Sequence, residues 1–194
     1  MTDGTPPERR ERARLTAHEM AVFAMLGTLM FISKQVMEAF PNIHLLGVFT
    51  VTFTVVYRVK ALIPIYIFVF LEGLIAGFAL WWIPYLYIWT VLWGATMLLP
   101  KKMNPKIARV VYAAVCGLHG LAYGTLYAPA HVIMFMGGDF SKMFAWISSG
   151  FLWDVKHAVG NLLLGTLIPD LSKLLVMLEN RFGRLGNNKK GLPR

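Results

Sequence analysis

Ionisable and hydrogen-bonding side chains interrupt the long apolar stretches of this chain at a few positions. The densest group is Asp154, His157 and Asn161, whose spacing of three and then four residues places them on one helical face. A carboxylate, an imidazole and an amide on one face can hydrogen-bond a polar ligand. Ionisable groups inside a membrane are costly, so they usually face a cavity, a partner or a transport pathway.

A second polar stripe begins at His119. Tyr123 and Tyr127 follow at successive four-residue intervals, so the three side chains share one helical face. Two interpretations remain open for this stripe. The tyrosines either hydrogen-bond neighbouring helices or, together with the histidine, contact a ligand.

Three further charged residues lie within or beside apolar stretches. Glu72 lies eleven residues after Ala61. At about 1.5 Å per helical residue it is roughly 16 Å deep, near the middle of a bilayer. It is either a structural glutamate bonded to a neighbouring helix or a ligand-facing group. Lys34 and Glu38, four residues apart, are predicted to form an ion pair on one face.

Aromatic residues gather near one predicted turn and at the start of a later helix. Tryptophan and tyrosine at such depths are most often interfacial anchors. Trp89 and Trp93 lie deeper, four residues apart, and are predicted to wall an outward-facing pocket suited to a flat, hydrogen-bonding or cationic molecule. The surrounding aromatic residues are Trp81, Trp82, Tyr85, Tyr87, Trp146 and Trp153.

The composition indicates which elements must position these groups. Of the 194 residues, 57% are hydrophobic and 15% charged, against about 45–50% and about 25% in soluble domains. The surplus apolar surface must face lipid, which predicts an all-α integral membrane bundle. The net charge of +9 comes from basic clusters separated by apolar stretches, a pattern typical of cytoplasmic loops rather than of a nucleic-acid binder.

Six transmembrane helices are predicted. The basic residues lie at both termini and in alternate loops, which predicts cytoplasmic termini in a multi-pass membrane protein. A membrane domain over residues 15–182 is expected between flexible cytoplasmic tails at 1–14 and 183–194, and the segment from Pro169 to Arg181 is predicted to be an interfacial helix. The expected spans are 15–39, 44–57, 61–82, 85–99, 107–135 and 143–168.

Motifs for energy coupling and metal catalysis are missing from the sequence. No GxxxxGK[ST] phosphate loop occurs, so an ATPase would have to be a separate subunit. His18 and Glu19 begin an HExxH-like string, but Val22 stands where the second histidine is required. No metal, cofactor or catalytic residue is predicted.

These features together resemble the substrate-binding S component of an energy-coupling factor (ECF) vitamin transporter. The resemblance covers about residues 15–180 and rests on size, six spans, cytoplasmic ends and a polar pocket toward the outside. The first helix also carries the family's Ala-x-x-x-Ala pattern at Ala17 and Ala21, which Ala24 and Gly27 continue. Small residues allow such close contact between helices.

The resemblance implies capture of a vitamin or related micronutrient by a protein of the bacterial cytoplasmic membrane. Its partners would be the lipid bilayer, a transmembrane coupling subunit and two ATP-binding subunits. Ala17, Ala21 and Ala24 would contact the coupling subunit. The family forms its site from the first outer loop and the outer halves of later helices. With the residues considered above, the candidate binding set is Glu38, Asn42, His44, Glu72, Trp89, Trp93, His119, Tyr123, Tyr127, Asp154, His157 and Asn161.

Two other classes of function stay open on the sequence. One is an intramembrane enzyme that uses Glu72, His119 and His157 as acid, base or metal ligands. The other is an accessory membrane protein without a ligand, whose polar groups only join helices.

Overall fold

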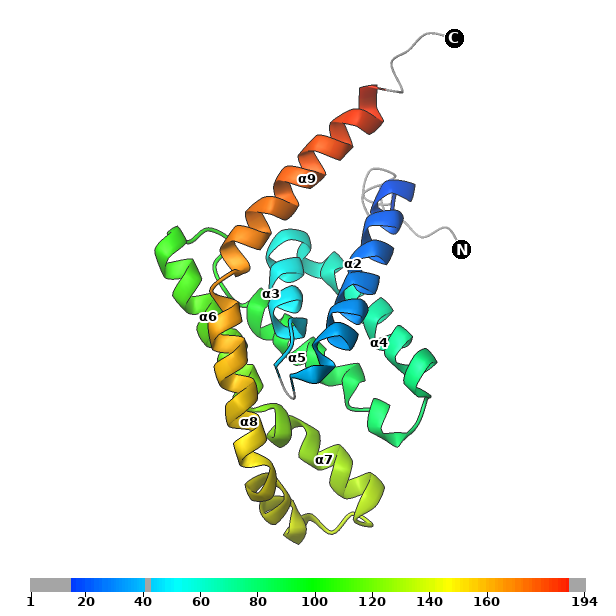
Figure 1. Ribbon diagram of the computed structural model, residues 1–194, viewed down its shortest axis with the longest axis vertical. Helices are drawn as coiled ribbons and strands as arrows, with labels where there is room; N and C mark the ends of the chain where they lie inside the picture. Colours follow the sequence, from blue (N-terminus) through cyan, green and yellow to red (C-terminus); the bar gives the residue numbers. More distant parts are fainter. Residues whose placement is uncertain (1–14, 41–42, 189–194) are drawn as a thin grey trace, which may run out of the picture.

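The described part of the chain, residues 15–40 and 43–188 of a computed structural model, contains only helices as regular elements (Figure 1). The all-α prediction is therefore confirmed for these residues. Four short 3₁₀ segments, η1 (Met37–Ala39), η2 (Arg58–Ala61), η3 (Leu80–Trp82) and η4 (Phe140–Lys142), join the longer elements. These are α2 (Ala17–Val36), α3 (Leu46–Tyr57), α4 (Leu62–Ala76), α5 (Tyr85–Met97), α6 (Pro105–Leu121), α7 (Tyr123–Phe135), α8 (Met143–Gly165) and α9 (Ile168–Asn188).

Several helical segments are long and apolar enough to cross a membrane. Three such segments, Ala17–Ala39, Leu46–Ala76 and Pro105–Phe135, lie within the described residues. A fourth is formed if Phe140–Gly165 and Ile168–Phe182, which meet at a 52° bend, count as one span. An all-helical protein with three to four apolar helices of this length agrees with the prediction of a membrane protein.

One end of the bundle gathers polar contacts between the start of α2, the α3–α4 junction and α9. Lys60 Nζ lies 2.5 Å from the Glu19 carboxylate. Glu179 of α9 accepts a hydrogen bond of 2.7 Å from the Tyr57 hydroxyl, and its other oxygen lies 3.3 Å from His18 Nε2. We call this the basic end, because Arg58 begins η2 here and Arg109, near the start of α6, pairs with Asp170 near the start of α9. In Figure 1 it is the upper part of the bundle.

The opposite end is marked by contacts between the end of α2, the start of α3, the second half of α4 and α8. Lys34 Nζ lies 2.8 Å from Glu72 Oε2, and the rings of His44 and His157 are 4.7 Å apart. The chain thus passes from this end through α3 to the basic end at Lys60 and back through α4 to Glu72. The reversal occurs at Arg58, whose φ of 54° lies in the left-handed region.

Helix α3 occupies the centre of the bundle. Of its 12 residues, eight are buried, and they point in every direction around its axis. A helix that is apolar all round belongs in a core or a membrane. Its neighbours among the helices are α2, α5, α6, α8 and α9.

Helices α6 and α8 pack extensively against each other, and glycines allow their close approach. A Cβ atom placed on Gly165 would lie 2.8 Å from the Ala113 Cα atom of α6. A Cβ atom on Gly120 would lie 3.0 Å from the backbone nitrogen of Ala158 in α8. Small residues permit this backbone-to-backbone approach, which brings the polar face of α8 against α6.

Local sequence signals explain several helix ends. Thr16 and Glu19 form a capping box at the start of α2, with Glu19 N donating to Thr16 Oγ1 at 3.1 Å. Asn104 caps α6, and Pro105 occupies its first turn. Gly77 ends α4 with a φ of 90°, a conformation that glycine adopts without steric cost.

The elements depart from the expected spans in three places. The segment 107–135 is divided at Ala122 into α6 and α7, and the helix expected to reach Trp82 ends at Ala76. The predicted interfacial helix corresponds to α9, which continues to Asn188. The expected tail at 1–14 and the end of the expected C-terminal tail lie outside the described residues.

Candidate functional site

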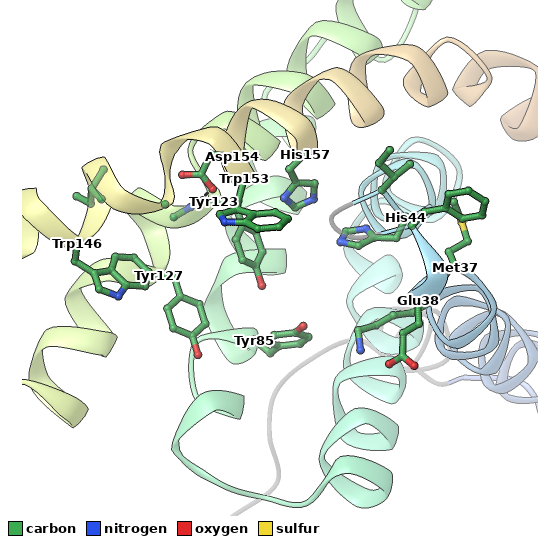
Figure 2. A pocket seen from close by; sticks show the side chains of 16 residues that line it. Met37, Glu38, His44, Tyr85, Tyr123, Tyr127, Trp146, Trp153, Asp154 and His157 are labelled. Carbon is green, nitrogen blue, oxygen red and sulfur yellow. Dashed lines mark hydrogen bonds between the residues drawn. The ribbon is translucent and has the colours of Figure 1, made fainter.

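A pocket with a volume of about 460 Å³ opens at the end of the bundle opposite the basic end. Figure 2 shows side chains that approach it from several elements, with Asp154, Trp153 and Tyr123 facing His44 and Glu38 across the space. The volume falls in the range of small-molecule sites, about 300–1,000 Å³. The lining residues are Lys34, Met37, Glu38, Phe40, Ile43, His44, Tyr85, Tyr123, Gly124, Tyr127, Trp146, Ile147, Gly150, Trp153, Asp154 and His157.

The α2 side of the pocket is held by a buried ionic contact with α4. Glu72 is 1% exposed, and its two oxygens accept from Lys34 Nζ at 2.8 Å and from Gln35 Nε2 at 3.3 Å. The predicted pair between Lys34 and Glu38 is therefore wrong. The lysine turns to the carboxylate on the neighbouring helix, because a buried charge is stabilised only by a direct partner.

One face of helix α8 lines the opposite side of the pocket. Trp146, Gly150, Trp153, Asp154 and His157 recur at the three- and four-residue intervals of a single helical stripe. Asp154 and His157 are 6% and 3% exposed. The same stripe continues to Asn161, so the prediction that these polar residues share a face is confirmed.

The Asp154 carboxylate is fixed by the backbone of the next helix. Its Oδ1 atom accepts a hydrogen bond of 3.0 Å from the backbone nitrogen of Gly124. A Cβ atom on Gly124 would lie 2.3 Å from Asp154 Oδ2. Glycine at the start of α7 is thus the residue that leaves room for this carboxylate at the pocket.

Stacked rings extend from the pocket along α7 and α8. Tyr123 and Tyr127 stack at 6.3 Å between centroids, and Tyr127 stacks on Trp146 at 6.0 Å. His131 continues the stack, 4.6 Å from Trp146. Parallel aromatic faces of this kind suit a flat ligand, which gains dispersion and stacking contacts along its whole ring.

Two histidines meet at the inner part of the pocket. The rings of His44 and His157 are 4.7 Å apart in an edge-to-face arrangement, and Tyr123 lies 5.0 Å from His157. His44 Nδ1 and His157 Nε2 have no hydrogen-bond partner among the described residues. Buried polar atoms are nearly always paired in folded proteins, so these two nitrogens are the groups best placed to hydrogen-bond a ligand.

Trp89 and His119 do not line the pocket but pack against residues that do. Trp89 is 1% exposed, and its ring lies within 6.2 Å of the rings of His44, His119 and Tyr123. His119 Nε2 lies 3.0 Å from the Ile88 carbonyl oxygen. Both residues were predicted as ligand contacts; neither lines the described cavity, and both pack against rings that do.

Other predicted site residues lie away from the cavity. Trp93, predicted to wall the pocket, donates from Nε1 to the Arg58 carbonyl oxygen at 3.0 Å and does not line the described cavity. One four-residue step along α5 carries it from the level of Trp89 toward the basic end. Asn161 donates to the Cys116 carbonyl oxygen at 3.3 Å and joins α8 to α6. Asn42 lies outside the described residues.

Several pocket residues were predicted only as interfacial anchors. Tyr85, Trp146 and Trp153 line the cavity. For the two tryptophans the sequence held a signal, since they fall on the helical stripe that carries Asp154 and His157. Lys156 lies off this stripe, with its Nζ atom 4.2 Å from the centre of the Trp153 ring.

The residues that an intramembrane enzyme would use have separate partners. Glu72 is bonded to α2 side chains, His119 lies against a backbone carbonyl, and His157 packs on His44. Within the described residues, no group of three or more histidines, cysteines and acids is arranged to hold a metal ion.

Comparison with known proteins gives no assignment for this arrangement. No family model matches the chain, and no curated protein or solved structure is similar to it. The function must therefore be inferred from the fold and the pocket.

Proposed function

We propose that this chain is the substrate-capture subunit, or S component, of an ECF-type importer in the bacterial cytoplasmic membrane. It binds a vitamin or related flat micronutrient and relies on a coupling subunit and two ATP-binding subunits for uptake. The observation that carries the proposal is the aromatic pocket at the end of the bundle opposite the basic residues. Basic residues favour the cytoplasmic side, so this pocket opens outward.

A six-span arrangement fits the helices. The apolar segment Leu46–Ala76 has 31 residues, which as one straight helix would measure about 46 Å. Because the chain reverses at Arg58 instead, we count α3 and α4 as two separate passes. With α2, α5, the α6–α7 segment and α8, the chain would cross six times, and both termini would be on the cytoplasmic side.

The exposed alanines of α2 support the proposal that a partner subunit binds this helix. Ala17, Ala21 and Ala24 are exposed along one side of this helix, and Thr28 continues the same stripe. Gly27 does not belong to this surface, because a Cβ atom there would lie 2.8 Å from the Pro64 carbonyl oxygen of α4. The alanines are therefore available for the coupling subunit, whereas Gly27 serves packing within the chain.

Changing the alanine stripe is expected to separate transport from binding. Ala21→Trp places a bulky ring where a neighbouring helix must approach closely, so uptake into cells or vesicles that contain the whole transporter should be lost. Ligand affinity of the isolated subunit should stay within about twofold of the original.

The matched control is Leu29→Trp, since Leu29 is 46% exposed on another side of α2. This variant should transport normally. Loss of ligand binding in Ala21→Trp, or equal loss of uptake in both variants, would contradict the proposed coupling surface.

The direct test of the proposal is a native mass spectrum of the protein gently extracted from its own host. An added mass that corresponds to a coupling subunit with two ATPases, or to a retained small molecule, is expected. A protein that carries neither, and whose unfolding temperature no micronutrient changes, would instead favour an accessory role.

A further inference from the structure

More negative than positive side chains line the pocket. Asp154 and Glu38 supply two carboxylates, and Lys34 is the single lysine or arginine among the described lining residues. Its ammonium is 2.8 Å from Glu72, so that buried carboxylate already balances it. The two pocket carboxylates therefore remain without a neutralising charge from Lys34.

Asp154 is the more enclosed of the two acids. It is 6% exposed, and its polar contact within the described residues is the hydrogen bond from the Gly124 backbone nitrogen. No lysine, arginine or histidine of the described residues forms an ion pair with it. A buried ionised carboxylate is expensive unless it is paired, so this site favours an incoming positive charge.

Aromatic faces surround the same carboxylate. Tyr123 and Trp153 lie beside Asp154 at the cavity, and Tyr127 stacks between Tyr123 and Trp146. The face of an aromatic ring carries partial negative charge and attracts cations within about 6 Å. Trp153 shows this behaviour within the protein, because Lys156 Nζ lies 4.2 Å from its ring centre.

We propose that the captured ligand is a flat organic cation, whose charged centre lies against Asp154 between the aromatic side chains of α7 and α8. This inference rests on the proposed capture function and narrows its substrate to one charge class. An anionic ligand would face two carboxylates, and a neutral ligand would leave Asp154 without a counter-charge.

Probes that differ mainly in charge test the inference on the intact purified subunit. The pair 1-methylnicotinamide and nicotinamide shares one ring system and differs by a methyl group and a positive charge. Thiamine is a larger cation, riboflavin is neutral, and nicotinate and biotin are anions. Titration calorimetry and the unfolding temperature of the protein give two independent readouts.

Binding is expected for at least one cation, and the neutral and anionic probes should bind at least tenfold more weakly. Asp154→Asn retains an oxygen that can accept from Gly124 N but removes the charge. This variant should lose at least tenfold in affinity for the cation, which corresponds to about 1.4 kcal/mol. Its elution profile and ligand-free unfolding temperature show whether it is folded.

Asp139→Asn is the matched control. Asp139 lies at the turn before α8, outside the pocket, where hydrogen bonds from the Ser141 hydroxyl and from Lys142 hold the pKa of its carboxyl below the usual range. Removing this charge should leave cation affinity unchanged. An equal loss in both variants would mean that general surface charge, rather than Asp154, attracts the ligand.

The outcomes separate the two proposals. A neutral or anionic probe that binds as tightly as the best cation overturns the cation inference and leaves the capture function intact. The same holds if Asp154→Asn is folded and binds the cation with unchanged affinity. If no probe binds and the purified protein retains no small molecule, the capture function itself is contradicted and the inference fails with it.

Discussion

Glu72→Ala is expected to lower the free energy of unfolding by about 3 kcal/mol, because it leaves a lysine without its partner inside the bundle. Lys34 is 21% exposed and Glu72 1%, with 2.8 Å between Nζ and Oε2. Breaking a buried pair by removing one member typically costs about 3–5 kcal/mol. Because Lys34 is partly exposed, we expect a loss of stability at the lower end of this range. Reversible unfolding in mixed detergent micelles measures it.

A second substitution distinguishes loss of the ion pair from loss of packing. The double variant Glu72→Leu with Lys34→Met replaces both charges by apolar groups, and it should be more stable than Glu72→Ala. Lys142→Met is the control, since its pair with Asp139 is largely exposed and contributes little. A Glu72→Ala protein as stable as the original would contradict the α2–α4 contact on which the pocket wall depends.

Gly165→Ala is expected to lower the free energy of unfolding by about 2–3 kcal/mol, the upper part of the range for overpacked sites. The added methyl group would lie 2.8 Å from the Ala113 Cα atom. A backbone atom cannot move aside as the end of a flexible side chain can. Helices α6 and α8 must therefore separate, and unfolding in detergent reports the cost.

Gly94→Ala is the matched control for this prediction. A Cβ atom on Gly94, within α5, meets no neighbouring atom within 4 Å. Alanine is favoured over glycine in a helix by up to about 1 kcal/mol, so this variant should be as stable as the original or slightly more stable. A gain in stability from both substitutions would mean that α6 and α8 do not approach as closely as described.

Both predictions concern contacts that determine the shape of the pocket. The Lys34–Glu72 pair fixes the end of α2, and Met37 and Glu38 follow directly in η1. The close approach of α6 and α8 places Asp154 beside Gly124 and His157 beside His44. The cavity is thus shaped by one helix contact in its wall, through Lys34, and by one between α6 and α8 at residues that do not line it.

The sequence alone determined the class of protein and the composition of individual helix faces. Its apolar surplus predicted a helical membrane protein, and the described helices agree. The spacing of Asp154, His157 and Asn161 predicted one shared face, and these three are buried together on α8. Such statements concern one helix at a time, and for these the 3.6-residue period is sufficient.

Only the tertiary structure decided which helix faces pack together and at what depth in the bundle each residue lies. Glu72 bonds to Lys34, 38 residues earlier in the chain, whereas the local pairing rule favoured Glu38. Trp89 and Trp93 share a face of α5, yet Trp89 supports the pocket and Trp93 bonds to Arg58 near the basic end. The rotation and vertical offset of each helix depend on backbone contacts such as that of Gly165 with Ala113. These contacts join residues far apart in sequence, and the period of a single helix carries no information about them.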